Sequence, residues 1–453
     1  MPPFCRFSRV FLVFPGKPSL LGGKERFVTV SFFTLGCKVN QYETQYLAQC
    51  FAQKGYQIVE GETAQVLVIN SCTVTAMSDK KARQLLHRLR RKNPDSILVL
   101  CGCFPQAFPD QAAALDADVI TGNTNRTEIP DLVEQARQNK VIKHRPHPLG
   151  ELFEPMQVQG FARHTRAFLK IQDGCDRYCT YCIIPTARGH SRSKPLDALA
   201  REAQLLADQG YREIVLTGID LTSYGRELGL TLSDAVAAAS KPEGICRVRL
   251  GSLEPDEISQ EEIDALAQCS KLCPQFHLSL QSGCDATLKR MGRRYDSAFY
   301  RDLLLRLRAA FPHCSFTTDV MVGFAGETQE EFEQSKAFIA KCGFAQIHLF
   351  PYSIRPGTPA AKLPQVPDYI KTNRMAEMEQ VAQEAWNAFL QAGIGQVQQV
   401  LLESTLTPLG RLGHTANYRP VAVPVHQGNR GELVQVQIQE AGNEFCFGRV
   451  LEK

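Results

Sequence analysis

The first part of the chain alternates short aliphatic and β-branched runs with amphipathic stretches of helical period. Strands are predicted over residues 28–35, 66–70, 97–100 and 119–121, and helices over 41–54 and 77–92. This alternation is typical of an open, mainly parallel α/β sheet. We therefore expect an α/β domain over residues 27–145, preceded by a poorly ordered extension over residues 1–26 and followed by a linker rich in Pro and His.

The middle of the chain continues the alternation at greater length. Strands are predicted over 167–172, 213–217, 247–250, 276–280, 315–322 and 346–350, with helices such as 196–209 and 300–311 between them. Strands joined by crossover helices predict a partial or complete (β/α) barrel, whose chemistry lies at the carboxyl ends of the strands. We expect this domain over residues 160–393, closed by a long helix over 369–392.

The tail changes to a two-residue period. Val434, Val436 and Ile438 alternate with polar residues after turn residues at 428–431. This pattern favours a small closed all-β barrel of the oligonucleotide-binding type over residues 394–453. Near the start of the chain, the apolar run over 10–14 is too short to span a membrane, so we expect no membrane partner.

The composition indicates the cellular compartment of the protein. The 453 residues are 44% hydrophobic and 22% charged, as in soluble globular proteins, and a net charge of +4 does not by itself indicate a nucleic-acid binder. Sixteen cysteines without a secretory signal indicate a reducing, cytoplasmic setting, where thiols serve metals or redox chemistry. Nine of them show no ligand spacing and are interpreted as small buried side chains: Cys5, Cys50, Cys246, Cys269, Cys273, Cys284, Cys314, Cys342 and Cys446.

Three cysteines follow the first predicted strand of the central domain on one loop. Cys175, Cys179 and Cys182 have the spacing C-x3-C-x2-C, and three thiolates can hold three irons of a [4Fe–4S] cluster. The open fourth iron can chelate S-adenosylmethionine (SAM), which an electron from the cluster can then cleave. The alternative is a zinc knot with a fourth ligand such as His190, but structural zinc sites usually pair two C-x2-C units.

The segment DGCDRYCTYC resembles the signature of the radical SAM superfamily, and its extension IIPTARGHSRSKP resembles the methylthiotransferases in particular. The resemblance covers nearly the whole chain from residue 28 onward. It implies that SAM is bound at the strand ends, by Thr217 and Gly218 (LTGID), Ser252 and Glu254 (RLGSLEP), Gln281 and Ser282 (LSLQSG), Arg293 (MGRRY) and Asp319 (TTDVMVGFAGET). Each of these polar residues is equally compatible with a satisfied strand end or cap. Ala325 stands where relatives usually have Pro, which we expect to alter a turn.

Another three cysteines each follow a predicted strand of the N-terminal domain. Adjacent strand ends of an open parallel sheet converge on one crevice, so Cys37, Cys72 and Cys103 could meet there, or could be unrelated buried thiols. TLGCKVNQYE, INSCTVT and GCFPQ resemble the cysteine motifs of the methylthiotransferase N-terminal domain, although relatives usually have Ala at Pro105. The resemblance implies an auxiliary [4Fe–4S] cluster that carries the transferred sulfur. Cys101 is a competing ligand, but alternation places it within the strand, which favours Cys103.

Two features point to RNA. The helix over 77–92 carries a run of basic residues that begins with Lys80, Lys81 and Arg83, although charge on a helix is more often a solvated face. The small barrel suits single-stranded loops. GCKVNQYE and the tail motif GHTANYRPV resemble the branch of the family that acts on N6-threonylcarbamoyladenosine next to the anticodon.

This branch implies a tRNA anticodon stem-loop as substrate and a TRAM-type barrel with His414, Asn417 and Tyr418 as RNA contacts. It also implies an electron donor such as flavodoxin or ferredoxin. In the expected reaction, one SAM methylates sulfur on the auxiliary cluster and a second SAM gives the radical that activates C2 of adenine. Alternative substrates are isopentenyladenosine in tRNA and an aspartate of a ribosomal protein, and the non-enzyme alternative is an iron–sulfur RNA-binding sensor.

Overall fold

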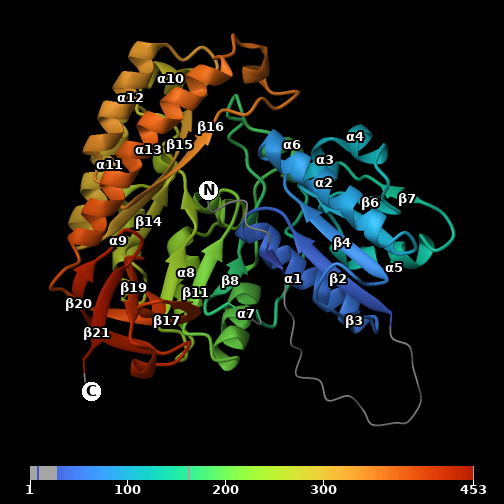
Figure 1. The fold of residues 1–453 in the computed structure, drawn as a ribbon, viewed down its shortest axis with the longest axis horizontal. Coiled ribbons are helices and arrows are strands. Elements are labelled where there is room, and N and C mark those ends of the chain that lie inside the picture. Colours follow the sequence, from blue (N-terminus) through green and yellow to red (C-terminus); the bar gives the residue numbers. More distant parts are fainter. Residues whose placement is uncertain (1–7, 10–27, 162–163, 452–453) are drawn as a thin grey trace.

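The computed structural model describes residues 8–9, 28–161 and 164–451 (Figure 1). Three regions follow one another along the chain: an N-terminal α/β region, a central region of parallel strands and helices, and a C-terminal barrel. Most of the extension predicted over residues 1–26 lies outside the described residues.

The N-terminal region is built on one sheet. Within the described residues its order is β1 (Ser8–Arg9), β2 (Thr29–Thr34), β4 (Val66–Ser71), β5 (Ile97–Gly102), β6 (Val119–Thr121) and β7 (Val141–Lys143), with β3 (Gln57–Ile58) also paired to β2. All pairs are parallel except β1 with β2. The connecting helices are α1 (Lys38–Gln53), α2 (Ala76–Lys92), α3 (Cys103–Ala107), α4 (Pro109–Ala113), η2 (Arg126–Glu128) and α5 (Ile129–Gln135).

The sheet is covered on both faces, which is why its strands are almost continuously apolar. Alternate residues of β4 enter two different cores: Leu67 and Ile69 pack with Leu86 of α2, whereas Val66 and Val68 pack with Phe51 of α1. Every residue of β4 is buried. The predicted open parallel sheet is thus confirmed.

The central region contains two parallel sheets. One has the order β12 (Arg247–Leu250), β11 (Glu213–Thr217) and β8 (Ala167–Lys170); the other has β13 (Ser252–Leu253), β14 (Gln275–Leu278), β15 (Ser315–Val322) and β16 (Gln346–Pro351). A parallel bridge between Val248 and Leu272 joins them. Together they form the predicted partial barrel, and a short antiparallel pair, β9 (Gln172–Asp173) and β10 (Arg192–Ser193), precedes and follows the cysteine loop.

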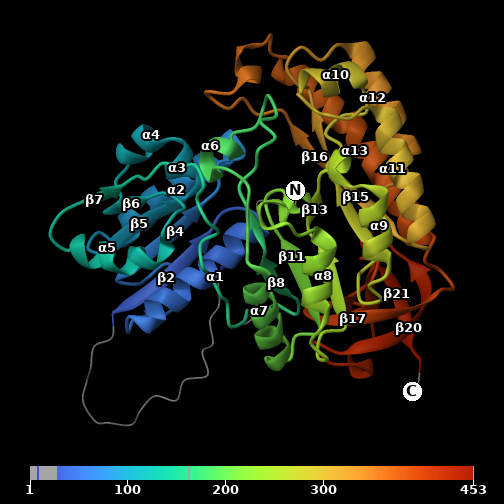
Figure 2. The same ribbon diagram turned by 180° about the vertical axis from the view of Figure 1, so that it is seen from behind.

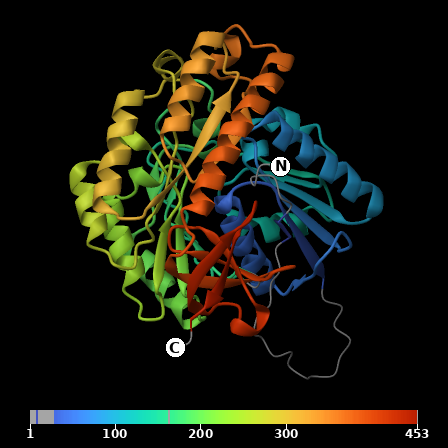
Figure 3. The same cartoon turned by 60° about the vertical axis from the view of Figure 1, so that its left-hand side comes forward.

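Helices line the outside of this partial barrel (Figures 2 and 3). They are α7 (Leu196–Asp208), α8 (Leu232–Ser240), α9 (Gln260–Ala267), α11 (Ser297–Ala310), α12 (Gln329–Lys341) and α13 (Asp368–Gln391); the shorter α6 (Ile184–Arg188) and α10 (Asp285–Arg290) lie nearer the strand ends. Capping boxes at Thr231 and Thr328 fix the starts of α8 and α12, because each threonine and the acidic residue three positions later satisfy one another's backbone amides. In the described part of the chain, no helix combines the length and the apolar character needed to cross a membrane.

The C-terminal region is the predicted closed barrel. It is formed by β17 (Val397–Thr407), β18 (Gly410–Thr415), β19 (Pro420–Val423), β21 (Cys446–Val450) and β20 (Leu433–Ala441). The barrel docks beneath the central strands, at their amino-terminal ends: Arg247, the first residue of β12, donates to the carbonyl of His414 at 3.1 Å, and Ser315, the first residue of β15, donates to the carbonyl of Asn417 at 2.6 Å.

The segment between the first two regions is packed rather than detached. Its Phe153, Met156 and Val158 are buried in the central core. The Tyr42 hydroxyl of α1 donates to the Met156 carbonyl at 3.2 Å, and Gln49 Nε2 donates to the carbonyl of residue 157 at 2.9 Å. The N-terminal and central regions therefore share a continuous packed boundary.

Candidate active site

The cysteine loop of the central region begins directly after β9. Gly174 has φ +75°, and a β-carbon there would lie 1.8 Å from the carbonyl oxygen of His190, so only glycine fits. The Cys175 amide donates to the Gly189 carbonyl at 3.0 Å, and the Cys182 amide donates to the Cys179 carbonyl at 2.9 Å. These bonds hold the three thiols on one tight loop.

Two of the residues predicted to bind SAM lie beside this loop. Arg293 Nη1 donates to the Cys179 sulfur at 3.4 Å, and the same guanidinium forms an ion pair with Glu254 and donates to the Tyr295 hydroxyl at 3.0 Å. Glu254 also lies 3.4 Å from Nε of Arg177. The Glu254–Arg293 pair therefore places a fixed cation against the Cys179 sulfur.

Two further residues at the loop were missed by the sequence reasoning. The Cys175 sulfur lies 4.0 Å from Asp220 Oδ2, and Gln172 Oε1 accepts from the amides of Ile219 and Asp220 at 2.9 and 2.8 Å. Burial raises the pKa of Asp220 to about 7, and the charges of Glu257 and Glu254 add to this rise. The only signal in the sequence was that Asp220 closes the motif LTGID.

Thr217 and Gly218 lie at the end of β11, next to this turn. Thr217 is buried, and a β-carbon on Gly218 would lie 2.8 Å from Gln172 Oε1. Glycine at position 218 therefore leaves room for the Gln172 amide that holds Asp220.

The remaining predicted SAM residues divide between the strand edge and the protein interior. Gln281, with φ +68°, bridges β15: its amide donates to the Asp319 carbonyl at 2.8 Å. Asp319 Oδ2 lies 3.3 Å from His277 Nε2, inside the strands, and Ser252 lies half-buried on β13. Ser282 is fully buried, and its hydroxyl donates to Ser335 of α12 at 3.4 Å; its role toward SAM stays a prediction.

The second triad stands at the ends of three adjacent strands. Cys37 caps α1 after β2, Cys72 follows β4, and Cys103 is the first residue of α3 after β5. A β-carbon on Gly36 would lie 3.0 Å from Cys72 Cβ. Burial raises the pKa of the Cys72 thiol, and the charges of the neighbouring Cys103 and Cys37 add to this rise.

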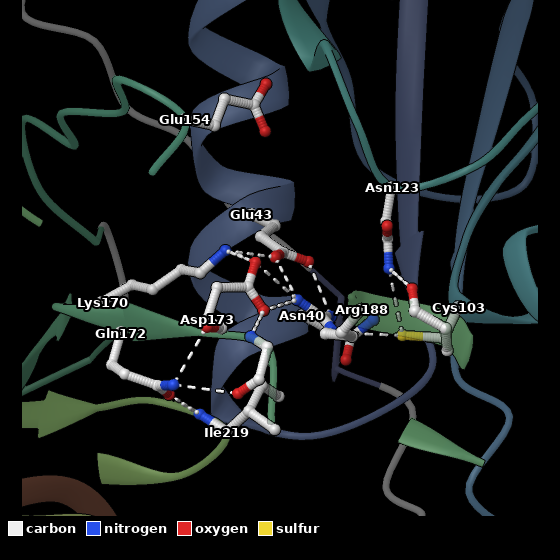
Figure 4. Close-up of polar contacts among 12 residues, drawn as sticks. Asn40, Glu43, Cys103, Asn123, Glu154, Lys170, Gln172, Asp173, Arg188 and Ile219 are labelled. Atoms are coloured by element: carbon white, nitrogen blue, oxygen red, sulfur yellow. Dashed lines mark hydrogen bonds and ion pairs between the residues drawn. The ribbon is translucent and has the colours of Figure 1, made fainter. Parts of the chain in front are cut away.

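Each sulfur of this triad has a polar neighbour. The Cys37 thiol donates to Asn40 Oδ1 at 3.3 Å, Cys72 accepts from the Val74 amide at 3.5 Å, and Cys103 accepts from Arg188 Nε at 3.3 Å and from Asn123 Nδ2 at 3.8 Å (Figure 4). Cys101 lies within β5, buried in the core with Val68 and Val99, and its thiol donates to the Ile69 carbonyl at 3.5 Å. This placement favours Cys103 as the ligand.

Both triads have the donor set of a [4Fe–4S] cluster, which takes three cysteine thiolates and leaves one iron for another ligand. Among the residues that the structure describes, no three His, Cys, Asp or Glu side chains are arranged to hold a single metal ion.

The predicted RNA contacts on α2 lie near the second triad. Lys80 is exposed, Lys81 is half-buried, and the Arg83 guanidinium lies 5.7 Å from the centre of the Phe104 ring. Farther along the helix, Arg88 and Lys92 pair with Glu62 at 2.9 and 2.5 Å. The start of α2 therefore presents the positive charge that is not committed to these acidic partners.

The predicted RNA contacts on the barrel are half-buried at His414 and Tyr418 and buried at Asn417, and their role toward RNA stays a prediction. The Tyr418 ring lies 4.9 Å from the Arg166 guanidinium and 4.8 Å from that of Arg249, and it stacks on His414 at 4.5 Å between ring centres. His414 also contacts Glu403 at 2.7 Å, and Asn417 Nδ2 donates to the His313 carbonyl at 3.1 Å. The Tyr418 ring and the Asn417 side chain therefore hold the barrel against the central region, whereas the His414 side chain is engaged within the barrel.

The comparisons with known proteins agree with this geometry. The Radical SAM superfamily matches residues 169–339, and the Uncharacterized protein family UPF0004 matches residues 29–122. A solved structure of the radical SAM methyltransferase TsrM from Kitasatospora setae has a TM-score of 0.55 over 74% of this chain and 77% of its own, at 14% identity. The parallel strands and the cysteine loop thus define a radical SAM protein, with a [4Fe–4S] cluster and SAM as its cofactors.

The curated relatives are more specific. The threonylcarbamoyladenosine tRNA methylthiotransferase MtaB of Bacillus subtilis is 38% identical over 94% of this chain and 97% of its own length. The protein of the same name from Thermotoga maritima is 37% identical over 83% of this chain and 86% of its own. The chain therefore belongs to the radical SAM methylthiotransferase family.

Proposed function

We propose that this enzyme converts N6-threonylcarbamoyladenosine in tRNA to its 2-methylthio derivative, using SAM and two [4Fe–4S] clusters. The observation that carries the proposal is the pair of cysteine triads, one on a loop of the partial barrel and one at the strand ends of the N-terminal sheet. The chain that holds them is 38% identical to the threonylcarbamoyladenosine tRNA methylthiotransferase MtaB of Bacillus subtilis.

Cys175, Cys179 and Cys182 would hold the cluster that binds SAM, and Cys37, Cys72 and Cys103 would hold the auxiliary cluster. When bound, the first supplies the electron that cleaves SAM and the second supplies the sulfur that is transferred. Each triad would leave one iron of its cluster without a protein ligand, which matches this division because neither cluster needs a fourth protein ligand.

The chain's own side chains orient and shield this chemistry. Arg293 places a cation at the Cys179 sulfur, and Glu254 fixes the direction of that guanidinium. Gln172 holds the turn that places Asp220 beside Cys175, while Thr217 and Gly218 form the strand end predicted to receive the methionine amino group. Four of these side chains are buried and limit the access of water to the reacting atoms: Gln172, Thr217, Asp220 and Arg293.

The tRNA would be bound at its anticodon stem-loop, with the target base extruded toward the strand ends as base-modifying enzymes require. Lys80, Lys81 and Arg83 at the start of α2 supply positive charge on the same side of the sheet as the second triad. The electron would come from a small carrier such as flavodoxin or ferredoxin, in the cytoplasm where tRNA is modified.

The test is mass spectrometry of tRNA nucleosides from cells that lack the chain, complemented with the intact chain or with Cys175→Ala. We expect the 2-methylthio form of N6-threonylcarbamoyladenosine only with the intact chain. Restoration of 2-methylthio isopentenyladenosine instead, or of a methylthiolated ribosomal-protein peptide, would overturn the substrate assignment.

A further inference from the structure

A buried cluster of charged side chains lies beside Cys103, at the segment that leads into the Cys175 loop (Figure 4). Its members are Glu43 of α1, Lys170 at the end of β8, Asp173 before the cysteine loop, and Arg188 at the end of α6, and each is less than 4% exposed. Lys170 Nζ lies 2.7 Å from Glu43 Oε1 and 2.6 Å from Asp173 Oδ2. The cluster therefore joins an N-terminal helix to the segment that leads into Cys175.

Arg188 is the member that reaches a cysteine. Its Nη1 lies 2.6 Å from Glu43 Oε1 and 3.2 Å from Asp173 Oδ1, while its Nε donates to the Cys103 sulfur at 3.3 Å. A guanidinium can make these three contacts at once because its donors form a rigid planar fork. The same side chain is thus shared by two carboxylates and one candidate cluster ligand.

The backbone beside Arg188 reaches the other triad. Gly189, the next residue, accepts the Cys175 amide at 3.0 Å, and Ala187, the preceding residue, accepts Asn123 Nδ2 at 2.6 Å. The segment 187–189 therefore touches a ligand of each triad, one through a side chain and one through the main chain.

We propose that Arg188 is a positioning residue that fixes the auxiliary cluster relative to the SAM-binding loop and sets the electron affinity of that cluster. The proposal rests on the auxiliary cluster assigned above to Cys37, Cys72 and Cys103. A cation and an N–H donor at a cluster sulfur stabilise the reduced, more negative cluster, so Arg188 raises the reduction potential of the auxiliary site.

The experiment uses the full chain with Cys175, Cys179 and Cys182 replaced by Ala, reconstituted anaerobically, so that only the auxiliary site holds iron. Arg188→Lys is introduced into this parent because Lys keeps the charge between Glu43 and Asp173 but lacks the fork. Arg188→Met alone would leave two buried carboxylates short of a partner, so the second variant is Glu43→Gln/Arg188→Met, which removes the pair together.

The matched control is Arg126→Lys. Arg126 contacts the same Glu43 at 2.8 Å and also Glu154, but no cysteine. Circular dichroism verifies the fold of every variant, and two properties are measured: the midpoint potential of the cluster by potentiometric electron paramagnetic resonance, and the rate of iron loss to a chelator.

We expect both Arg188 variants to have a more negative midpoint potential than the parent and to lose iron roughly 10–100-fold faster, while the Arg126 variant stays close to the parent. Equal potentials in the parent and the folded Arg188 variants, or an equal shift in the Arg126 variant, would overturn this inference alone. A parent chain that binds no iron would overturn the proposed auxiliary cluster, and the inference with it.

Discussion

The two cysteine triads are held by different parts of the fold. Cys175, Cys179 and Cys182 share one loop, whose shape depends on local turns at Gly174 and at Tyr178, which has φ +50°. Cys37, Cys72 and Cys103 come together only because β2, β4 and β5 are neighbours in register. The first site therefore depends on a short segment, whereas the second depends on the folded sheet. Amino-acid substitutions should therefore affect the two sites separately.

The two sites should differ most clearly when each triad is removed in turn. Replacing Cys175, Cys179 and Cys182 by Ala should abolish reductive cleavage of SAM to 5′-deoxyadenosine, because no cluster remains to deliver the electron. Replacing Cys37, Cys72 and Cys103 by Ala should retain this cleavage but abolish the methylthio product. Iron should fall in each from about eight to about four per chain. Loss of SAM cleavage in both variants would contradict two independent sites.

Two glycines offer a subtler version of the same separation. A β-carbon on Gly174 would meet the His190 carbonyl at 1.8 Å, and one on Gly102, with φ +97°, would meet the Ser71 carbonyl at 2.5 Å. Gly174→Ala should lower iron at the loop site and Gly102→Ala at the strand-end site. Backbone strain at each should cost about 1–3 kcal/mol or more of unfolding free energy.

Gly55→Ala is the control for these two variants, because its φ is also positive but no atom lies within 4 Å of a β-carbon there. Iron content and cluster spectra are the measurements. If Gly102→Ala emptied the loop site instead, the division between a local and a sheet-borne site would be wrong.

The charged boundary between the sites should respond to acid. Burial alone would raise the pKa of Glu43, but Arg126, Arg188 and Lys170 hold it at about 2, below the ordinary 4.5. A lowered folded-state pKa means that the stabilisation is complete above pH 4.5 and is lost as the pH falls from there toward 2. Glu43→Gln should therefore cost about 3–5 kcal/mol of unfolding free energy at pH 7, since it leaves buried cations unpaired.

Urea unfolding of the metal-free chain measures this cost. The difference in unfolding free energy between the intact chain and Glu43→Gln should narrow below pH 4.5. The exposed Glu379 of α13 provides the matched variant, Glu379→Gln, which should change little. A difference in unfolding free energy that stayed constant down to pH 3 would show that the charge of Glu43 does not provide this stabilisation.

The barrel interface should lose stability by a smaller amount. Tyr418→Ala removes a ring held between the guanidinium groups of Arg166 and Arg249, and we expect a cost of about 1–3 kcal/mol with iron at both sites retained. Tyr369→Ala on α13, where the ring is 69% exposed, should be nearly neutral. Equal costs for the two variants in thermal unfolding would contradict the fastening role of Tyr418.

The smallest effect is expected at the start of α2. Lys80→Gln/Lys81→Gln should weaken tRNA binding several-fold. The slope of log K against log salt concentration should become shallower by roughly 1–2, because each phosphate contact releases counterions. Arg201→Gln on α7, a surface residue paired with Asp197, is the control. An unchanged salt dependence in filter binding would remove these lysines from the RNA surface.

The sequence predicted most of the sheet strands because they are buried on both faces and leave continuous apolar runs, as in β4 and β5. It did not predict β3, β10 or β13, since two-residue strands have no period to detect, and it missed the three-residue β7. The cysteines were predicted from spacing and from strand ends. Arg188, Gln172 and Asp220 were not, because the contacts that define them join residues far apart in the chain.

Polar residues are harder to assign from the sequence. Among the predicted contacts, Ser282 and Asn417 are buried, whereas His414 and Tyr418 are half-buried, and their roles toward SAM or RNA stay predictions. A one-dimensional pattern distinguishes polar from apolar positions and cannot distinguish a polar interface from a polar surface.

The docking of the barrel under the central strands gives the molecule a fixed internal length. β15 begins at Ser315, which holds the barrel, and ends at Val322 near the strand ends that carry the chemistry, a rise of roughly 20–25 Å. An RNA that touches the barrel and also delivers a base to the cysteines must bridge this distance. The enzyme would then select its substrate by the distance between the base and the helical stem. A loop that is too short or too long would not be modified even if it carried the correct nucleoside.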